Sequence, residues 1–208
     1  MSLLEDCQKS LSKNNFNCEI VDNSVEAGNI IKKLIGEFQP ATISYGDSET
    51  LRSTGIIEYC KACSDFKFID TFNHDESFRE QIGKRKEALS VDLFLTGTNA
   101  VTLDGVLVNL DMIGNRIGGL IFGPRKVILT IGVNKIVPDI HSAFKRIREH
   151  AAPKNAARHP ELKTPCIKTG KCMNCSSMTR ICNNWSITEK SYPKGRINII
   201  LINEELGL

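Results

Sequence analysis

Two short hydrophobic runs in the middle of the chain constrain its fold more than any other feature. Residues 93–95 (Leu-Phe-Leu) and 127–131 (Val-Ile-Leu-Thr-Ile) are almost wholly apolar. Runs of this length are typical of strands that a parallel sheet buries on both faces. Each run leads into a polar segment that contains a glycine, residues 96–99 and 132–135. Ligands of open α/β sheets bind just beyond the carboxyl ends of the strands, so these segments are the first candidates for a ligand site.

The residues between the two runs predict a hairpin and a short helix. Asp104-Gly105 interrupts the β-forming residues of 100–111, and this dipeptide is the strongest short hairpin signal. Residues 114–119 are rich in glycine and include Asn115 and Arg116. A guanidinium beside free backbone N–H groups suits a carboxylate or a phosphate, and its planar fork can bind two oxygens at once. We therefore expect Arg116 to clamp an anion.

A third polar segment, residues 45–50, follows a short strand predicted over 41–44. Gly46 permits a tight turn, and Asp47 or Ser48 can cap the helix that follows. The segment is either an anion site at a helix N-terminus or a plain helix cap. Residues 93–137 contain no His, Glu, Ser or Cys, so no catalytic Ser–His or Cys–His pair can form there. The catalytic residues are left unassigned, and the predicted ligand-binding residues are Gly46, Asp47, Ser48, Thr50, Thr96, Gly97, Thr98, Asn99, Asn115, Arg116, Asn134 and Lys135.

Helical and strand-like patterns alternate over the rest of the chain. Apolar spacing predicts a helix over 2–14, a second one capped by Asn23 or Ser24 and ended by Pro40, and a third over 75–89 with Phe78, Ile82 and Leu89 facing inward. Another helix is predicted to start at Pro138 or Asp139. Further strands are expected at 18–21, 66–70 and 197–202. Regular alternation of this kind predicts an α/β fold with a mainly parallel sheet flanked by helices.

The composition is that of an ordinary globular protein. The chain has 208 residues, of which 41% are hydrophobic and 25% charged, and this length suits one domain over 1–208 with an appendage at 152–185. No run approaches the roughly 18 apolar residues of a membrane span, and residues 1–6 lack the pattern of a secretion signal. We expect a cytoplasmic protein. A net charge of +3 and 6% aromatic residues give no reason to expect nucleic-acid binding.

Residues 152–185 differ from the rest because they hold four cysteines in a segment poor in aliphatic residues. Cys166, Cys172, Cys175 and Cys182 are spaced C-x5-C-x2-C-x6-C. Disulfides are rare in the cytoplasm, so clustered cysteines there indicate metal or redox chemistry. Four thiolates from one short loop can surround either a tetrahedral zinc ion or a 4Fe–4S cluster.

The spacing favours the iron–sulfur cluster over zinc. Structural zinc sites usually show two C-x2–4-C pairs, and this loop has one. Lys168, Lys171 and Arg180 would offset the negative charge of a thiolate-bound cluster. Four unligated cysteines are the remaining alternative. The other cysteines, Cys7, Cys18, Cys60 and Cys63, are expected to be small hydrophobic residues.

Several motifs together resemble the lactate-utilization (LUD) domain family. They begin with the run Thr-Gly-Thr-Asn-Ala-Val-Thr at 96–102 and continue through Asp104-Gly105, Val108-Asn109, Gly114-Asn115-Arg116, Gly123-Pro124 and Gly-Val-Asn-Lys at 132–135. Ala152-Pro153, Asn155-Ala156 and Arg158, followed by the four cysteines, are similar to the cysteine-bearing branch of this family. The resemblance implies a Rossmann-like three-layer sandwich of the NagB/RpiA/CoA-transferase type. It also implies a role in systems that oxidise lactate alongside iron–sulfur partner subunits.

The sequence thus predicts an iron–sulfur protein that acts in oxidation of lactate or a similar small hydroxy acid. It would be an electron-transfer or accessory subunit, with a small carboxylate or phosphate ligand and an oxidoreductase partner subunit. Two alternatives stay open: a non-redox isomerase or transferase, and a small-molecule sensor. In both, the metal centre (4Fe–4S or zinc) would be structural.

Overall fold

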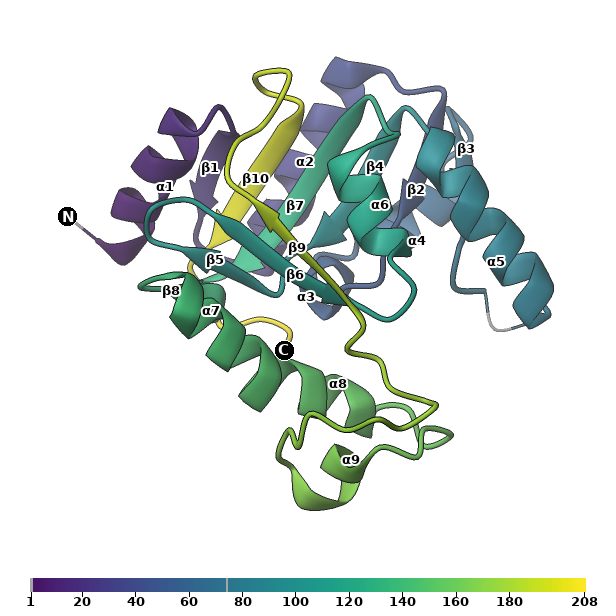
Figure 1. Ribbon diagram of the computed structural model, residues 1–208. Helices are drawn as coiled ribbons and strands as arrows, with labels where there is room; N and C mark the ends of the chain where they lie inside the picture. Colours follow the sequence, from purple (N-terminus) through teal and green to yellow (C-terminus); the bar gives the residue numbers. More distant parts are fainter. Residues whose placement is uncertain (1, 74) are drawn as a thin grey trace.

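The fold is built on a six-stranded sheet in the order β1-β10-β7-β4-β2-β3, in which every strand pair is parallel. It is known from a computed structural model that describes residues 2–73 and 75–208 (Figure 1). The strands are β1 (Asn17–Val21), β2 (Thr42–Tyr45), β3 (Lys67–Ile69), β4 (Leu93–Gly97), β7 (Lys126–Gly132) and β10 (Ile197–Ile202). The prediction of a mainly parallel sheet is confirmed.

The two hydrophobic runs are β4 and β7, and they lie next to each other at the centre of the sheet. Every residue of β4 and of β10 is buried, as is all of β7 after Lys126. Their register pairs Thr96 with Leu129 and Gly97 with Thr130. Because the strands are parallel and adjacent, the polar segments that follow them emerge at the same edge of the sheet.

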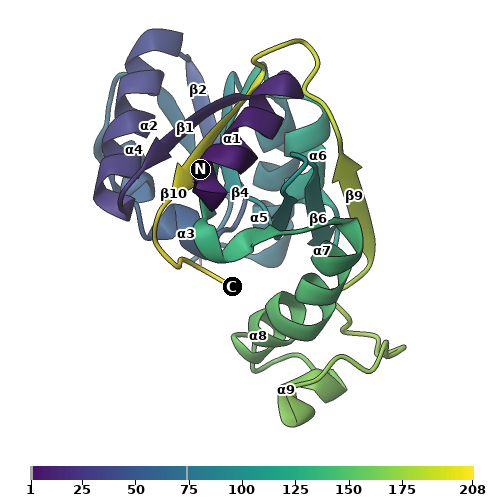
Figure 2. The same ribbon diagram turned by 90° about the vertical axis from the view of Figure 1, so that its left-hand side faces the viewer.

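Helices cover both faces of the sheet (Figure 2). One face carries α2 (Ser24–Phe38), α3 (Glu49–Arg52) and α4 (Ile56–Ala62), and the other carries α1 (Leu3–Lys13) and α6 (Asn115–Ile121). Residues at helical spacing in α2, such as Ala27, Ile31 and Ile35, pack against alternate strand residues such as Ile43 and Ile200. Asn23 begins α2, since its side chain accepts a hydrogen bond from the backbone N–H of Glu26 at 3.0 Å.

A second, four-stranded sheet, absent from the sequence-based prediction, adds a layer to the predicted sandwich. Its order is β8-β5-β6-β9, with β5 (Ala100–Thr102), β6 (Leu107–Asp111), β8 (Ile136–Val137) and β9 (Asn184–Thr188). β5 and β6 form the predicted hairpin, with Gly105 at a φ of +82°. One face of this sheet joins the core around α1, and the other packs against α7 (Ile140–Arg146). Since β8 has two residues and β9 lies beyond the cysteines, neither gave a recognisable strand pattern.

The cysteine-bearing appendage begins as a helix rather than as an irregular loop. α7 continues through a π-helical turn, Ile147–Ala151, into α8 (Ala152–Ala157). Pro153 cannot donate a backbone hydrogen bond, and the wider π turn just before it accommodates the missing donor. The irregular part is therefore residues 158–183, which contain only the short helix α9 (Pro165–Thr169). Figure 1 shows α8 and α9 projecting from the lower end of the molecule.

The prediction that Phe78 faces inward on the helix over 75–89 was wrong, whereas Ile82 and Leu89, predicted with it, are half-buried. Phe78 is 73% exposed, and α5 (Phe78–Glu87) has no buried residue. The helix lies beside β3, an edge strand of three residues, and so has little sheet surface to cover. The chain reaches β4 through the short 3₁₀ helix η1 (Ala88–Ser90).

Within residues 2–73 and 75–208, no helix combines the length and apolar character that crossing a bilayer requires.

Close packing between α6 and β4 gives a stability prediction. A Cβ atom on Gly119 would lie 2.6–2.8 Å from three ring atoms of Phe94, which is buried. Gly119→Ala should therefore lower the free energy of unfolding by about 1–3 kcal/mol. Gly36 is exposed in the last turn of α2, and a Cβ atom added there would meet nothing within 4 Å, so Gly36→Ala should raise it by about 0.5 kcal/mol. Urea denaturation of both variants measures the contrast, and equal stabilities would contradict it.

Candidate functional site

The predicted ligand-binding segments meet at the carboxyl ends of β2, β4 and β7, three adjacent strands. Residues 46–50 follow β2, residues 98 and 99 follow β4, and Asn134 and Lys135 follow β7. The segments are in contact: a Cβ on Gly97 would lie 2.3 Å from Ser48 Oγ. A Cβ on Gly46 would likewise lie 2.8 Å from Arg116 Cγ, so a side chain at either place would require its neighbours to move. Asn115, half-buried, begins α6 beside this edge.

Arg116 is held by acceptors within the protein. Its side chain is 12% exposed and forms an ion pair with Asp111 at 2.6 Å. The two terminal nitrogens donate to five oxygens, those of Gly97, Leu110 and the side chains of Asn99, Asn109 and Asp111, at 2.6–3.2 Å. An incoming anion would have to replace one of these acceptors. The anion clamp at Arg116 stays a prediction. In the observed contacts the side chain connects α6 to β4 and β6 through hydrogen bonds.

Lys135 is the least compensated charge at this edge. It is 5% exposed, and its Nζ donates to Thr50 Oγ1 at 2.8 Å. In the described part of the chain it forms no ion pair with a carboxylate. Burial lowers the pKa of Lys135 to about 7, and the nearby Arg146 and Arg116 act in the same direction. The amine is therefore partly neutral near pH 7.

Arg146 is a site residue that the sequence did not reveal. It lies in a cluster of charges on α7 that the sequence explains as a solvated surface. Its guanidinium instead donates to three backbone oxygens, those of Asn134 at 3.0 Å, Asn99 at 2.7 Å and Leu208 at 3.0 Å. The available signal was its position three residues after Ala143 and one before Ile147, both buried. We refer to Thr50, Asn134, Lys135 and Arg146 as the cradle.

The chain beyond β10 lies across the cradle. Thr50 Oγ1 donates to the backbone oxygen of Leu206 at 3.0 Å, and the Leu206 N–H donates to Asn134 Oδ1 at 3.3 Å. Figures 1 and 2 show the C-terminal end beside α3 and α7, at the edge where the strands end. Residues 206–208 were not among the predicted site residues, because nothing in their composition indicates a contact with residue 50 or 135.

The acidic residues after β2 connect this edge to the appendage. Asp47 and Glu49 both pair with Arg52, and Arg158 at the end of α8 reaches Glu49 at 2.5 Å and Asp47 at 3.9 Å. Ser48 caps α3 through the backbone N–H of Leu51 at 3.2 Å. Since α3 is a single turn, its dipole is small. Asp47 and Ser48 therefore serve local structure in the observed state.

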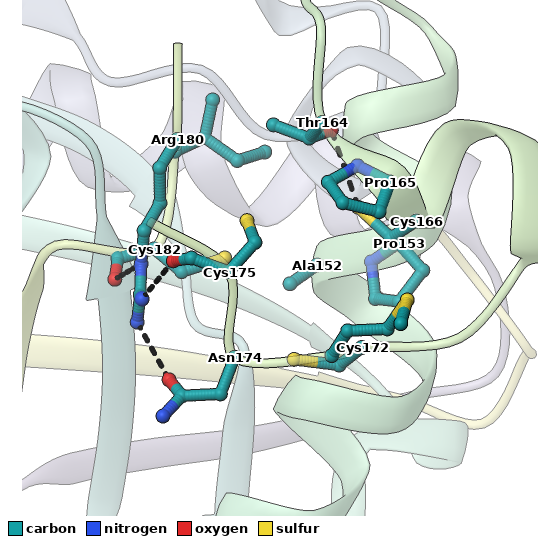
Figure 3. Close-up of a pocket in the computed structure, with 12 residues that line it drawn as sticks. Ala152, Pro153, Thr164, Pro165, Cys166, Cys172, Asn174, Cys175, Arg180 and Cys182 are labelled. Carbon is teal, nitrogen blue, oxygen red and sulfur yellow. Dashed lines mark hydrogen bonds between the residues drawn. The ribbon is translucent and has the colours of Figure 1, made fainter. Parts of the chain in front are cut away.

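The four clustered cysteines line one cavity between α8 and the irregular segment (Figure 3). Cys175 and Cys182 lie on the side of Arg180, and Cys166 and Cys172 lie on the other side, with Ala152 and Pro153 also lining the cavity. All four thiols are free and half-buried. In the part of the chain that the structure describes, no three His, Cys, Asp or Glu side chains are placed as ligands of one metal ion.

Two arginine side chains lie beside the cysteine cavity, and one of them, Arg180, lines it. Arg180 donates to the backbone oxygens of Cys175 at 2.5 Å and Cys182 at 2.9 Å, and shares Asn174 Oδ1 with Arg148. Burial raises the pKa of the Cys182 thiol, and the neighbouring Cys172 raises it further, while Arg180 opposes both. Thiols beside guanidinium groups are the donor types of a thiolate-bound metal centre, although the described side chains are not placed as ligands of one ion.

The remaining cysteines lie elsewhere. Cys7 and Cys60 are fully buried in the two hydrophobic cores that cover the sheet, and Cys18 and Cys63 are half-buried. Burial raises the pKa of Cys7 and of Cys60 to about 12, so neither thiol is reactive near neutral pH. They behave as the small hydrophobic residues that the sequence predicts.

The parallel sheet with polar segments at its carboxyl edge defines a Rossmann-like α/β protein. The sequence profile of the LUD domain matches residues 4–202, so the chain belongs to the LUD domain family. The resemblance found in the motifs is therefore confirmed. No curated protein matches the sequence.

One solved structure supports the fold, and a second is similar over about half of the chain. A DUF162 family protein from Deinococcus radiodurans is similar over 97% of this chain and 96% of its own, with a TM-score of 0.53 and 12% identity. Ribose 5-phosphate isomerase from Plasmodium falciparum is similar over 55% of this chain and 54% of its own, with a TM-score of 0.34 and 16% identity. At such low identity the first likeness indicates a shared fold and nothing about activity.

The burial of Lys135 predicts a pH-dependent stability. Its pKa is about 7 in the folded protein against an ordinary 10.5, so between these values the unfolded chain binds the extra proton and stability rises with pH. Lys135→Met removes the free-energy cost of burying a charged amine in the folded protein. The stability gained over the wild type should be largest at about pH 7 and below, and should shrink by on the order of 1–3 kcal/mol by about pH 9.5.

Urea denaturation at the two pH values measures this difference. Lys145→Met, at an exposed lysine of α7, is the control and should show the same offset from the wild type at both. A Lys135→Met offset that does not change with pH would mean that Lys135 stays protonated in the folded protein.

Proposed function

We propose that this LUD domain protein is an iron–sulfur protein that acts in the oxidation of lactate or a similar small hydroxy acid. Its role would be that of an electron-transfer or accessory subunit. The observation that carries the proposal is the gathering of Cys166, Cys172, Cys175 and Cys182 around one cavity, all with free thiols.

The donor set suits a 4Fe–4S cluster held by these four cysteines. Thiolate ligands carry negative charge, and Arg180 and Arg148 lie close enough to Cys182 to favour its charged form. When bound, such a cluster would supply transfer of single electrons. The chain's own contribution is to hold the four sulfur ligands on one cavity and to place cations beside them.

The small hydroxy acid would bind at the cradle. The Arg146 guanidinium and the Thr50 hydroxyl are hydrogen-bond donors suited to a carboxylate. Lys135 Nζ, partly neutral near pH 7, can accept a proton from a hydroxyl group of the ligand. Arg116, Asn99 and Gly97 would support the cradle from behind, because Asn99 binds Arg116 with its side chain and Arg146 with its backbone oxygen.

The ion pairs of Arg158 support a connection between the two sites. Arg158 ends α8, whose first residues line the cysteine cavity, and it binds Glu49 one residue from Thr50 of the cradle. A displacement of the cysteine segment would therefore move Arg158 and, through its ion pair with Glu49, would change the position of Thr50 at the ligand site. The proposal includes one domain over 1–208, a reducing cytoplasmic setting and an oxidoreductase partner subunit that exchanges electrons with the centre.

A second candidate function keeps the metal centre purely structural. It is favoured by the sparse structure of residues 158–183, where α9 is a helix of five residues. A bound zinc ion or cluster would supply folding free energy that such a segment otherwise lacks. The protein would then be a non-redox isomerase, transferase or sensor acting through the cradle.

Metal analysis of protein purified without oxygen separates these proposals. We expect four irons per chain, a visible absorption band and loss of that band on reduction. Cys→Ser at any one of the four positions should weaken or abolish the band, since each thiolate is a ligand. Cys63→Ser, at a half-buried cysteine outside the cavity, is the matched control and should leave it unchanged.

Stoichiometric zinc in a colourless protein would exclude the redox role and favour the structural one. Iron that remains fully bound in a Cys172→Ser variant would show that Cys172 is not a ligand.

A further inference from the structure

Residues 206–208 occupy the cradle in a way that the proposed function does not explain. They follow β10 and have no helix or strand structure of their own. Two of their backbone oxygens are bound by cradle donors, the Leu206 oxygen by Thr50 Oγ1 at 3.0 Å and the Leu208 oxygen by Arg146 Nη2 at 3.0 Å. The segment therefore sits where an oxygen-bearing ligand would bind.

Gly207 shows how closely the segment fits. A Cβ on this residue would lie 2.5 Å from Thr50 Oγ1 and 3.1 Å from Lys135 Nζ. Its φ of +71° is also one that residues with a side chain rarely adopt. Only glycine allows the backbone to lie directly on Lys135, and this contact helps to keep the amine from solvent.

The electrostatics of the cradle favour a different occupant. Lys135 is buried and Arg146 is half-buried, and in the described residues neither forms an ion pair with a side-chain carboxylate. The segment gives Thr50 a neutral peptide oxygen, that of Leu206, and the printed hydrogen bond of Lys135 Nζ goes to Thr50 Oγ1 rather than to the segment. An ionised acceptor beside Lys135 would form a charge-assisted hydrogen bond that the segment does not supply there. A small oxyanion can therefore compete with the segment.

We propose that residues 206–208 are an intramolecular competitor that fills the cradle in the ligand-free protein and is displaced by a small oxyanion. The inference rests on the proposed ligand site and adds its regulation. Oxygens of the incoming carboxylate or phosphate take the places of the Leu206 and Leu208 oxygens at Thr50 and Arg146. The carbon or phosphorus centre then lies beside Lys135, in the space that Gly207 leaves.

Because an oxyanion must first displace the segment, its observed affinity for the wild type is lower than its affinity for the open cradle. Apparent affinity falls in proportion to the fraction of molecules in the open state. If the segment leaves the cradle in about a tenth of the molecules or fewer, removing it should tighten oxyanion binding about tenfold or more.

Calorimetric titration of lactate, with inorganic phosphate as a separate arm, tests the proposal. Titrations compare the wild type, Gly207→Ala and a variant that lacks residues 206–208. Both variants should bind at least one probe about tenfold or more tightly than the wild type. Gly55→Ala is the matched control, because Gly55 has a similar φ of +69° but nothing within 4 Å of its Cβ position, and its affinity should equal that of the wild type.

Acylation of the Lys135 amine, followed by peptide mass spectrometry, reports the position of the segment without any ligand. The labelling rate should rise about tenfold or more in both segment variants and stay at the wild-type value in Gly55→Ala. Saturating lactate or phosphate should slow the labelling of the variant that lacks residues 206–208.

Equal affinities and equal labelling rates in the wild type and both variants would overturn the competitor while leaving the ligand site intact. Absence of lactate and phosphate binding in every protein, including the variant without the segment, would overturn the ligand site and the competitor with it. Tighter binding of phosphate alone would support the competitor and assign the phosphate class of ligand.

Discussion

Burial of β4, β7 and β10 on both faces is the constraint on which the rest of the structure depends. Strands buried in this way must satisfy their backbone groups within the ladder, and their side chains must be almost entirely apolar. Polar residues are therefore displaced to the strand ends. Because the strands are parallel, the ends that carry Thr96–Gly97 and Gly132 lie side by side. The chemical character of the protein is concentrated at this edge for reasons of packing.

Two cations at that edge show how surroundings decide the role of a charge. Arg116 has five oxygen acceptors, one of them the carboxylate of Asp111, so its charge is matched and its orientation fixed. Lys135 is buried more deeply, and its amine donates to the hydroxyl of Thr50. A nearby opposite charge stabilises the charged form of a side chain, and burial without such a counter-charge destabilises that form. Arg116 thus suits a structural role and Lys135 a chemical one.

The cysteine appendage is joined to this edge by few but specific contacts. Trp185 packs against Phe144 at 4.6 Å between ring centroids and lies under Arg148, which anchors the returning chain on α7. Arg158 ties the end of α8 to Glu49. Between these anchors, residues 158–183 have little regular structure, so a metal centre on the four thiols would order them. The same anchors would transmit that order to α3 and the cradle.

The sequence by itself determined the parallel sheet, the Asp104-Gly105 hairpin, the polar strand ends and the family, because hydrophobic runs, turn residues and local motifs are properties of neighbouring residues. It also singled out the four cysteines by their spacing. Only the tertiary structure decided that Arg146 turns inward, that Arg116 is enclosed by acceptors, and that residues 206–208 lie on Lys135. Two of these contacts join residues far apart along the chain, since Arg146 and Leu208 are separated by 62 positions and Lys135 and Gly207 by 72. Their formation depends on which strand ends become neighbours. The pattern of residues along the chain does not give the distance in space between two strand ends.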